Sequence, residues 1–319
     1  MKICLSICIA GLFFCGCASL TKTQITAVNQ FAKTSENFSA YPSKIMEELA
    51  DLRVQRGTIF ANSIDDPRLH IGELDSVYAF KVEDMRLSAK ADITFKIIDK
   101  YAQSLLLLSS DKYTTNLGTQ AQAFGENIDS LIFLYNQMGS VQKVPGGIGA
   151  GVAQWITAGG RLYIRTRQAR EVKKFVVLAD TLISVMTTNL TEYLNNTNLK
   201  DLIENEDRNV RSNYLSYLRQ RKTVTDVRGR DTLRLVSDTR SSLDNDREYI
   251  RMKTSVDAIR TLRDETVDAT QKLRTAHRKL AETVGTKRTL RTSISEVQTL
   301  YAEIRKLKLH IAFLENLKQ

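Results

Sequence analysis

The chain has no cysteine after position 17, although its first 17 residues contain four: Cys4, Cys8, Cys15 and Cys17. Residues 18–319 therefore have no thiol nucleophile and no thiol pair that could close a disulfide. Chains that depend on disulfides are mostly small secreted domains, whereas 319 residues are enough for one large domain or two ordinary ones. We expect a fold that is held together without covalent cross-links.

Proline and glycine are scarce as well. Three prolines and 15 glycines in 319 residues are too few for the frequent turns of a β-sandwich or β-barrel. Charged residues make up 26% of the chain and hydrophobic residues 42%. When the hydrophobic residues recur at regular spacing, such a mixture favours long helices.

Catalytic and cofactor-binding motifs are missing too. The sequence contains no G-x-S-x-G elbow, no Walker loop and no G-x-G-x-x-G between a strand and a helix. The run GGIGAG at 146–151 lacks the Lys-Ser/Thr of a phosphate loop, and the three histidines, His70, His277 and His310, have no repeated metal-ligand spacing. Clustered carboxylates such as Glu204, Glu206 and Asp207 are typical of solvated helix faces. We predict a non-enzymatic protein with no cofactor and no metal site.

Apolar residues recur every three or four positions over most of the chain, which places them on one stripe of an α-helix. Strands alternate every second residue and would not give this pattern. The sequence therefore predicts an all-α fold, an elongated antiparallel bundle of long, coiled-coil-like helices. The repeated positions are Phe31, Phe38, Ile45, Leu52 and Ile59; Leu117, Ala121, Phe124, Ile128, Leu131, Tyr135 and Met138; Trp155, Leu162, Ala169, Val172, Val176, Ala179, Ile183, Met186, Leu190 and Tyr193; and Leu290, Ile294, Val297, Tyr301, Ile304 and Ile311.

Turn-forming residues predict where the helices end. Breaks are expected at 62–73, 109–116, 139–151 and 195–198, where Asn198 and Asp201 have capping-box spacing. Pro42 predicts a kink or a short interruption without a change of heptad phase. Residues 224–236 fit either a helix or a small β-hairpin. Residues 249–317 fit either one helix or two helices folded back at Gly285.

The N-terminus resembles that of a bacterial lipoprotein. Lys2 precedes the apolar run ICLSICIAGLFFCGC at 3–17, and Phe14-Cys15-Gly16-Cys17 resembles the lipobox at which the signal peptide is removed. The resemblance implies that Cys17 carries diacylglycerol, and that Ala18 directs the protein to the outer membrane, facing the periplasm. An ordinary signal peptide cut near Ala18 and an uncleaved anchor are the alternatives.

We therefore expect three regions: a lipoprotein signal peptide at 1–16, a helical bundle at 17–194 with a glycine-rich loop at 139–151, and a long-helix C-terminal region at 195–319. The last region would pack on the bundle or extend it.

The chain is basic, with 46 Lys and Arg against 36 Asp and Glu. Basic residues concentrate after the loop, at Arg161, Arg165, Arg167, Arg170, Lys173 and Lys174, with Glu171 as the acid among them. An exported protein rarely meets nucleic acid, and base-stacking aromatics are not interleaved. The expected partners are the membrane, through the lipid anchor, and anionic lipid or an acidic envelope protein.

Directly before this basic run, residues 144–160, VPGGIGAGVAQWITAGG, contain no charge. They fit a segment in which glycine and alanine allow close helix packing, and they also fit an apolar tip that enters a bilayer with Trp155 at the interface. We predict a lipid-anchored helical scaffold, spacer or partner-binding module. The alternative is a membrane-active, bilayer-inserting or pore-forming-like helical protein.

Overall fold

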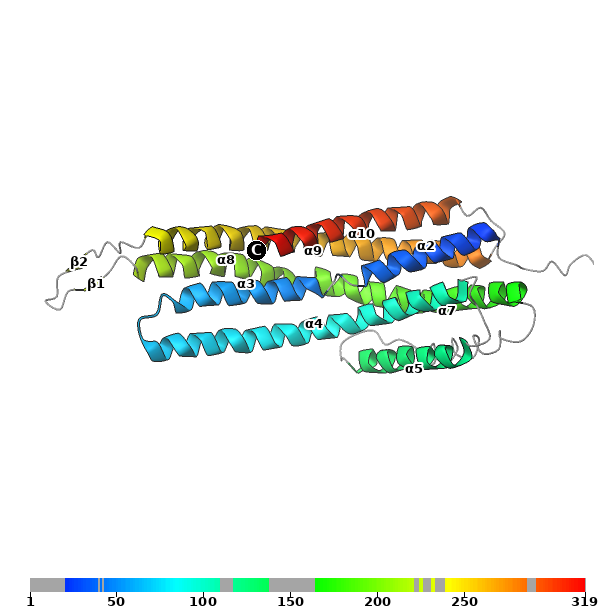
Figure 1. Ribbon diagram of the computed structural model, residues 1–319, viewed down its shortest axis with the longest axis horizontal. Coiled ribbons are helices and arrows are strands. Elements are labelled where there is room, and N and C mark those ends of the chain that lie inside the picture. Colours follow the sequence, from blue (N-terminus) through cyan, green and yellow to red (C-terminus); the bar gives the residue numbers. More distant parts are fainter. Residues whose placement is uncertain are drawn as a thin grey trace, which may run out of the picture.

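A computed structural model describes residues 21–39, 41, 43–109, 117–137, 164–220, 224–225, 231–232, 239–285 and 291–318. Within these, residues 86–87, 89–91, 117–126, 164–171, 220, 224–225, 231–232, 239–242 and 285 are described by their backbone alone. The described chain forms an elongated all-α bundle whose long helices run along one axis (Figure 1). The helices are α2 (Lys22–Phe38), α3 (Lys44–Ala61), α4 (Pro67–Ser109), α5 (Leu117–Asn136), α7 (Ile164–Asn195), α8 (Thr197–Gln220), α9 (Thr239–Gly285) and α10 (Arg291–Leu317).

Two pairs of consecutive helices act as long rods. Helix α3 continues the course of α2, and α8 continues that of α7, while α4 and α9 run back beside them (Figure 1). Helix α9 packs on α2, α3, α7, α8 and α10, and α5 packs on α4. The end of α10 is tied to α3 because Lys318 Nζ lies 2.9 Å from Glu48 Oε1 and 2.7 Å from Asp51 Oδ2.

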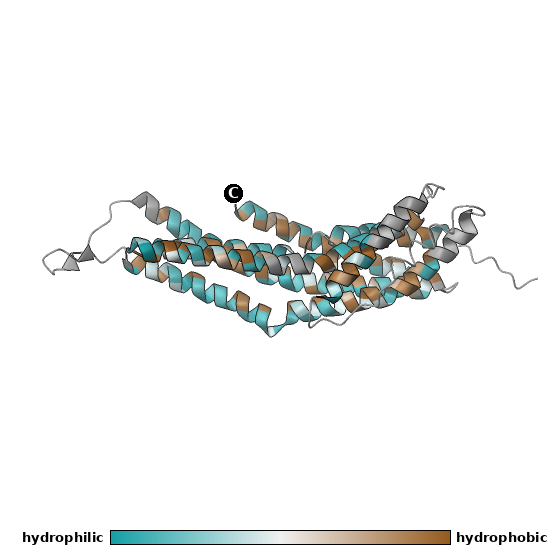
Figure 2. Ribbon diagram, turned by 90° about the horizontal axis from the view of Figure 1, so that it is seen from below, coloured by the Kyte–Doolittle hydropathy of each residue, from teal (hydrophilic) through white to brown (hydrophobic). Residues whose placement is uncertain are grey.

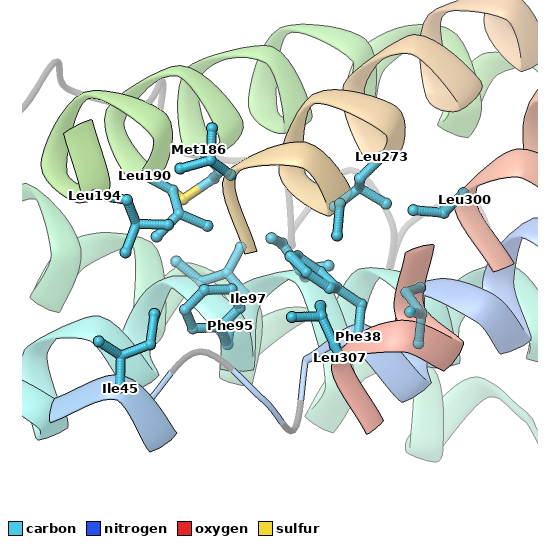
Figure 3. Close-up of a cluster of buried hydrophobic side chains, with 14 of the residues drawn as sticks. Phe38, Ile45, Phe95, Ile97, Met186, Leu190, Leu194, Leu273, Leu300 and Leu307 are labelled. Atoms are coloured by element: carbon cyan, nitrogen blue, oxygen red, sulfur yellow. The ribbon is translucent and has the colours of Figure 1, made fainter. Parts of the chain in front are cut away.

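The core confirms the first predicted stripe completely. Its residues, Phe31, Phe38, Ile45, Leu52 and Ile59, are all buried, although the helix is interrupted between Phe38 and Lys44. The interruption between α2 and α3 therefore preserves the heptad phase, and Pro42 itself lies outside the described residues. Figure 3 shows Phe38 and Ile45 among labelled side chains from α4, α7, α9 and α10. Along the coloured parts of the helices, hydrophobic and hydrophilic residues are interspersed (Figure 2).

Two tyrosines on the predicted stripes are not buried. Tyr193 is exposed and Leu194 is buried in its place, while Tyr301 is 56% exposed and Leu300 is fully buried. An α-helix turns every 3.6 residues, so an apolar stripe read at a strict seven-residue spacing drifts by about 20° per heptad, and the neighbouring residue takes over. Leu131, on the stripe of α5, is half-buried against the core.

The two open alternatives are both decided. Helices α9 and α10 are separate and pack against each other, so residues 249–317 fold back after Gly285. Residues 224–225 (β1) and 231–232 (β2) pair antiparallel, with Val224 opposite Thr232 and Thr225 opposite Asp231. This region is therefore a small hairpin, placed at the end of the bundle where α8 ends and α9 begins (Figure 1).

Two helix starts differ from the prediction. Helix α4 begins at Pro67, inside the predicted break, because Asp66 Oδ1 accepts hydrogen bonds from the backbone N–H groups of Arg68 and Leu69 at 2.8 and 3.2 Å. Proline is well suited to the first helical position, which needs no N–H partner. At 195–198 the cap is Asn196, whose Oδ1 accepts from Asn198 N at 2.9 Å, so the predicted capping box at Asn198 is wrong. The predicted loop at 139–151 lies outside the described residues.

Helix α10 offers a matched pair to test the core. Leu300 is fully buried and Leu309 is 65% exposed. Leu300→Ala should lower the free energy of unfolding by about 2–5 kcal/mol, because it removes buried methyl groups and leaves a cavity. Leu309→Ala should change it by less than about 0.5 kcal/mol. Urea denaturation followed by circular dichroism measures both, and equal losses for the two variants would contradict the orientation of α10.

Candidate functional site

The residues singled out by the sequence lie partly outside the described chain. Cys17, Trp155 and Arg161 belong to residues that the structure does not describe. Arg165, Arg167 and Arg170 lie in the first two turns of α7, described by backbone alone, and Lys173 and Lys174 follow on the same helix, half-buried and exposed respectively. The structure thus gathers the last five basic residues at the start of α7.

The bundle interior contains a buried polar network that joins three helices. The ring of His277 on α9 is fully buried. Its Nε2 lies 2.7 Å from the hydroxyl oxygen of Tyr101 on α4, and its Nδ1 lies 2.9 Å from Asp180 Oδ1 on α7. A neutral ring satisfies both contacts if Nδ1–H donates to Asp180 and Nε2 accepts from the tyrosine hydroxyl. Phe31 of α2 packs edge-on against the same ring, at 5.4 Å between centroids.

Burial decides the charge state of this network. Burial lowers the pKa of His277, and the hydrogen bond to Asp180 opposes this only in part. The same hydrogen bond lowers the pKa of Asp180, whose side chain is 40% exposed and keeps its contact with water. We therefore assign a neutral His277 beside an ionised Asp180 at neutral pH.

An Asp–His–hydroxyl chain also occurs in enzymes, where the hydroxyl is the nucleophile. Here Tyr101 is fully buried, and burial raises the pKa of its hydroxyl well above its usual value. A substrate could not reach this oxygen, and the tyrosine would ionise poorly. The geometry supports a structural role, in which buried polar atoms satisfy one another across α4, α7 and α9.

A second buried network lies on α3, α4 and α8. Arg53 Nη1 donates to both carboxylate oxygens of Asp84 at 2.8 Å, and Arg53 Nε donates to Glu206 Oε1 at 2.9 Å. Arg56 Nε lies 2.8 Å from Glu206 Oε2. Both carboxylates are almost fully buried. Burial raises the pKa of Asp84, while Arg53 acts to lower it.

The structure therefore corrects one sequence inference. Glu206 is not part of a solvated face: it is buried and paired with two arginines of α3. Its neighbours Glu204 and Asp207 do lie nearer solvent, and both pair with Arg260 of α9. The signal for Glu206 was its spacing, since it lies three residues after Ile203 and four before Val210, both buried.

Two grooves lie between helices. One, of about 380 Å³, lies between α2 and α10 and is lined by Gln30, Lys33, Thr34, Asn37, Val297, Gln298 and Tyr301. The other, of about 430 Å³, lies between α7 and α9 and is lined by Thr187, Thr188, Thr191, Glu192, Gln271, Arg274 and Thr275. In the second, Arg274 Nη1 donates to Thr188 Oγ1 at 3.1 Å. Neither groove contains a grouping of nucleophile, base and oxyanion donors.

Among the described residues, no group of three His, Cys, Asp or Glu side chains could hold a metal ion. In the same part of the chain, every helix is too short or too polar to cross a bilayer. No family model, curated protein or solved structure matches this chain.

The histidine network makes stability depend on pH. The pKa of His277 is lowered in the folded protein from its ordinary 6.5, so the unfolded chain takes up a proton below about pH 6.5 that the folded chain does not. The free energy of unfolding should therefore fall between pH 7.5 and pH 5.5, by at most about 1.4 kcal/mol per pH unit. The melting temperature, measured at each pH, should fall with it. In His277→Gln this dependence should be reduced, whereas His310→Gln, at a half-buried position of α10, should keep it. An unchanged slope in His277→Gln would show that other groups cause it.

The arginine network provides a second stability test. Arg53→Met should lower the free energy of unfolding by about 3–5 kcal/mol, because it leaves Asp84 and Glu206 buried without their main partner. Arg278→Met removes an exposed partner of Glu282 and should cost less than about 1 kcal/mol. Chemical denaturation compares the two, and a small loss in Arg53→Met would mean that these carboxylates reach water.

Proposed function

We propose that the protein is a lipid-anchored protein of the bacterial envelope that acts without catalysis, as a helical scaffold, spacer or partner-binding module. The anchor is diacylglycerol on Cys17, after removal of residues 1–16, and the location is the outer membrane, facing the periplasm. Its partners are the membrane, through this anchor, and anionic lipid or an acidic envelope protein.

One observation carries this proposal: a packed helix begins directly after the proposed anchor. Only Ala18, Ser19 and Leu20 separate Cys17 from Thr21. Thr21 caps α2 by a capping box, in which its hydroxyl oxygen accepts from Gln24 N at 3.2 Å and Gln24 Oε1 accepts from Thr21 N at 2.8 Å. Such an arrangement suits a rod attached to a membrane by one end.

The buried polar contacts between helices favour a role as a scaffold or a binding module. Its buried polar groups, Tyr101, His277, Asp84 and Glu206, contact one another or arginines of neighbouring helices. Each such contact links helices, and all four groups are buried, out of reach of a substrate. An elongated bundle of this kind offers a long, stiff surface rather than a pocket.

The alternative is a membrane-active protein that inserts residues 144–160. The uncharged composition of this segment favours it, together with the basic residues that follow at the start of α7. In this reading Trp155 would enter the interface and Arg161, Arg165, Arg167, Arg170, Lys173 and Lys174 would contact headgroups.

Replacing Cys17 tests the anchor. Cys17→Ala should abolish incorporation of labelled fatty acid, and uncleaved precursor should accumulate, because the acylated thiol is lost. Ser19→Ala leaves the cysteine in place and should be acylated normally. Fractionation should place the parent in the outer membrane.

An unlabelled parent that stays on membranes would overturn the lipid anchor. Adding the purified protein to dye-filled vesicles of anionic phospholipid distinguishes the scaffold from the membrane-active protein. The scaffold proposal expects intact vesicles, and dye release that ends when Trp155 is replaced by Ser would favour the membrane-active protein instead.

A further inference from the structure

Residues on four helices lie at the same level along the bundle axis, because they meet at the ring of His277. The distance from this level to each end of the bundle can be counted along the helices. Phe31 of α2, Tyr101 of α4 and Asp180 of α7 all contact this ring. Gln24 Nε2 donates to Thr283 O, so the start of α2 lies beside the end of α9. Arg274 meets Thr188, so higher residue numbers on α7 meet lower ones on α9. Both α2 and α7 therefore run antiparallel to α9 and begin at the same end of the bundle (Figure 1).

The start of α7 extends beyond the other helices at this end. From the level of His277, α9 continues for about 12 Å to Gly285 and α2 for about 15 Å to Thr21, at 1.5 Å per residue. Helix α7 continues for about 24 Å to Ile164. Its first turn, which contains Arg165 and Arg167, therefore passes the ends of α2 and α9, and Arg170 lies level with the end of α2 at about 15 Å. Figure 1 shows the same projection.

This end of the bundle is basic. Between Ile164 and Lys174, α7 carries five basic residues, Arg165, Arg167, Arg170, Lys173 and Lys174, and one acid, Glu171. Two more basic residues, Lys22 and Arg291, are exposed at the starts of α2 and α10. Ser293 Oγ lies 2.6 Å from Thr283 Oγ1, which places the start of α10 beside the end of α9.

We propose that this end is a membrane-contact surface, in which Arg165, Arg167, Arg170, Lys22 and Arg291 bind the anionic phospholipid headgroups of the membrane that holds the anchor. The inference rests on the proposed lipid anchor at Cys17. Four peptide units from Cys17 to Thr21 span at most about 14 Å. Since Gln24 ties the start of α2 to α9, the anchor holds the whole end close to the headgroups, where basic side chains act within a Debye length of about 8 Å.

The same geometry fixes the far end of the protein. Thr239, where α9 begins, lies about 57 Å from the level of His277 in the opposite direction. Strands β1 and β2 lie at that end (Figure 1). A bundle held at the membrane by the starts of α2 and α7 therefore presents this hairpin end about 70 Å from the anchor.

The orientation of the bundle relative to the membrane can be measured by energy transfer. The full, acylated protein is reconstituted in vesicles that contain phosphatidylglycerol and acceptor-labelled lipid. The mature chain has no free thiol once Cys17 is acylated, so a single added cysteine takes the donor dye. Thr23→Cys marks the proposed contact end and Leu243→Cys, at an exposed position near the far end, is its matched partner. Energy transfer to the lipid should be several-fold stronger from position 23. Equal transfer from both positions, or stronger transfer from position 243, overturns the proposed orientation.

Headgroup binding is measured by the rate at which the acylated protein leaves these vesicles for an excess of neutral phosphatidylcholine vesicles. Arg165→Gln, Arg167→Gln and Arg170→Gln combined should speed this transfer by up to about 100-fold, as expected for three basic residues near an anionic surface. The matched control combines Arg208→Gln, Arg211→Gln and Arg219→Gln, exposed residues of α8, and should transfer at the parent's rate. High salt should speed the parent more than the α7 variant, which keeps Lys22 and Arg291.

An α7 variant that transfers at the parent's rate overturns headgroup binding, and equal acceleration by both variants assigns the effect to net charge alone. The mass of the mature protein separates these results from a failure of the proposed function. If Cys17 carries no acyl chains, the proposed lipid anchor is wrong, and the membrane-contact surface that rests on it is wrong too. If Cys17 is acylated and orientation or transfer rate differs from expectation, only the contact surface is wrong.

Discussion

The fold depends on burying one continuous apolar stripe of α9. Among the described residues, this helix packs on α2, α3, α7, α8 and α10. Its 47 residues extend over about 70 Å, so the same stripe serves both ends of the bundle. Its buried apolar residues include Met252, Val256, Ile259, Leu262, Ala269, Leu273, Ala276 and Leu280. A distortion of α9 would therefore reach helices from the start and the end of the chain.

Most of the helical architecture could be predicted from the sequence because apolar spacing reports burial directly. The stripe from Phe31 to Ile59 is buried at every position, even across the interruption between α2 and α3. The prediction was wrong at Tyr193 and Tyr301, where an adjacent leucine is buried instead. Hydrophobicity alone does not separate a tyrosine from its leucine neighbour when the stripe drifts between them. The choice between one helix and two after Tyr249 needed the contacts of α10 with α9, which local sequence does not contain.

The buried polar networks could be predicted less well. Arg53 and Glu206 are 153 residues apart, and no local pattern joins them. The local sequence shows only that a polar residue lies on an apolar stripe, as Glu206 does between Ile203 and Val210 and as His277 does between Leu273 and Leu280. A polar residue at such a position must find a partner in the interior. Spacing thus identifies the residue, whereas only the fold identifies the partner.

The buried histidine also bears on how the helices find their alignment. Heptad repeats permit neighbouring helices to slip by seven residues while apolar side chains still meet apolar side chains. A slip of α9 by one heptad would bring Thr270 or Val284 to the place of His277, and the buried hydroxyl of Tyr101 would lose its acceptor ring. The same slip in α3 would put Met46 or Phe60 beside Asp84 and Glu206, leaving two buried carboxylates without a cation. The few polar residues of the core therefore select one alignment from several that hydrophobic packing alone would accept.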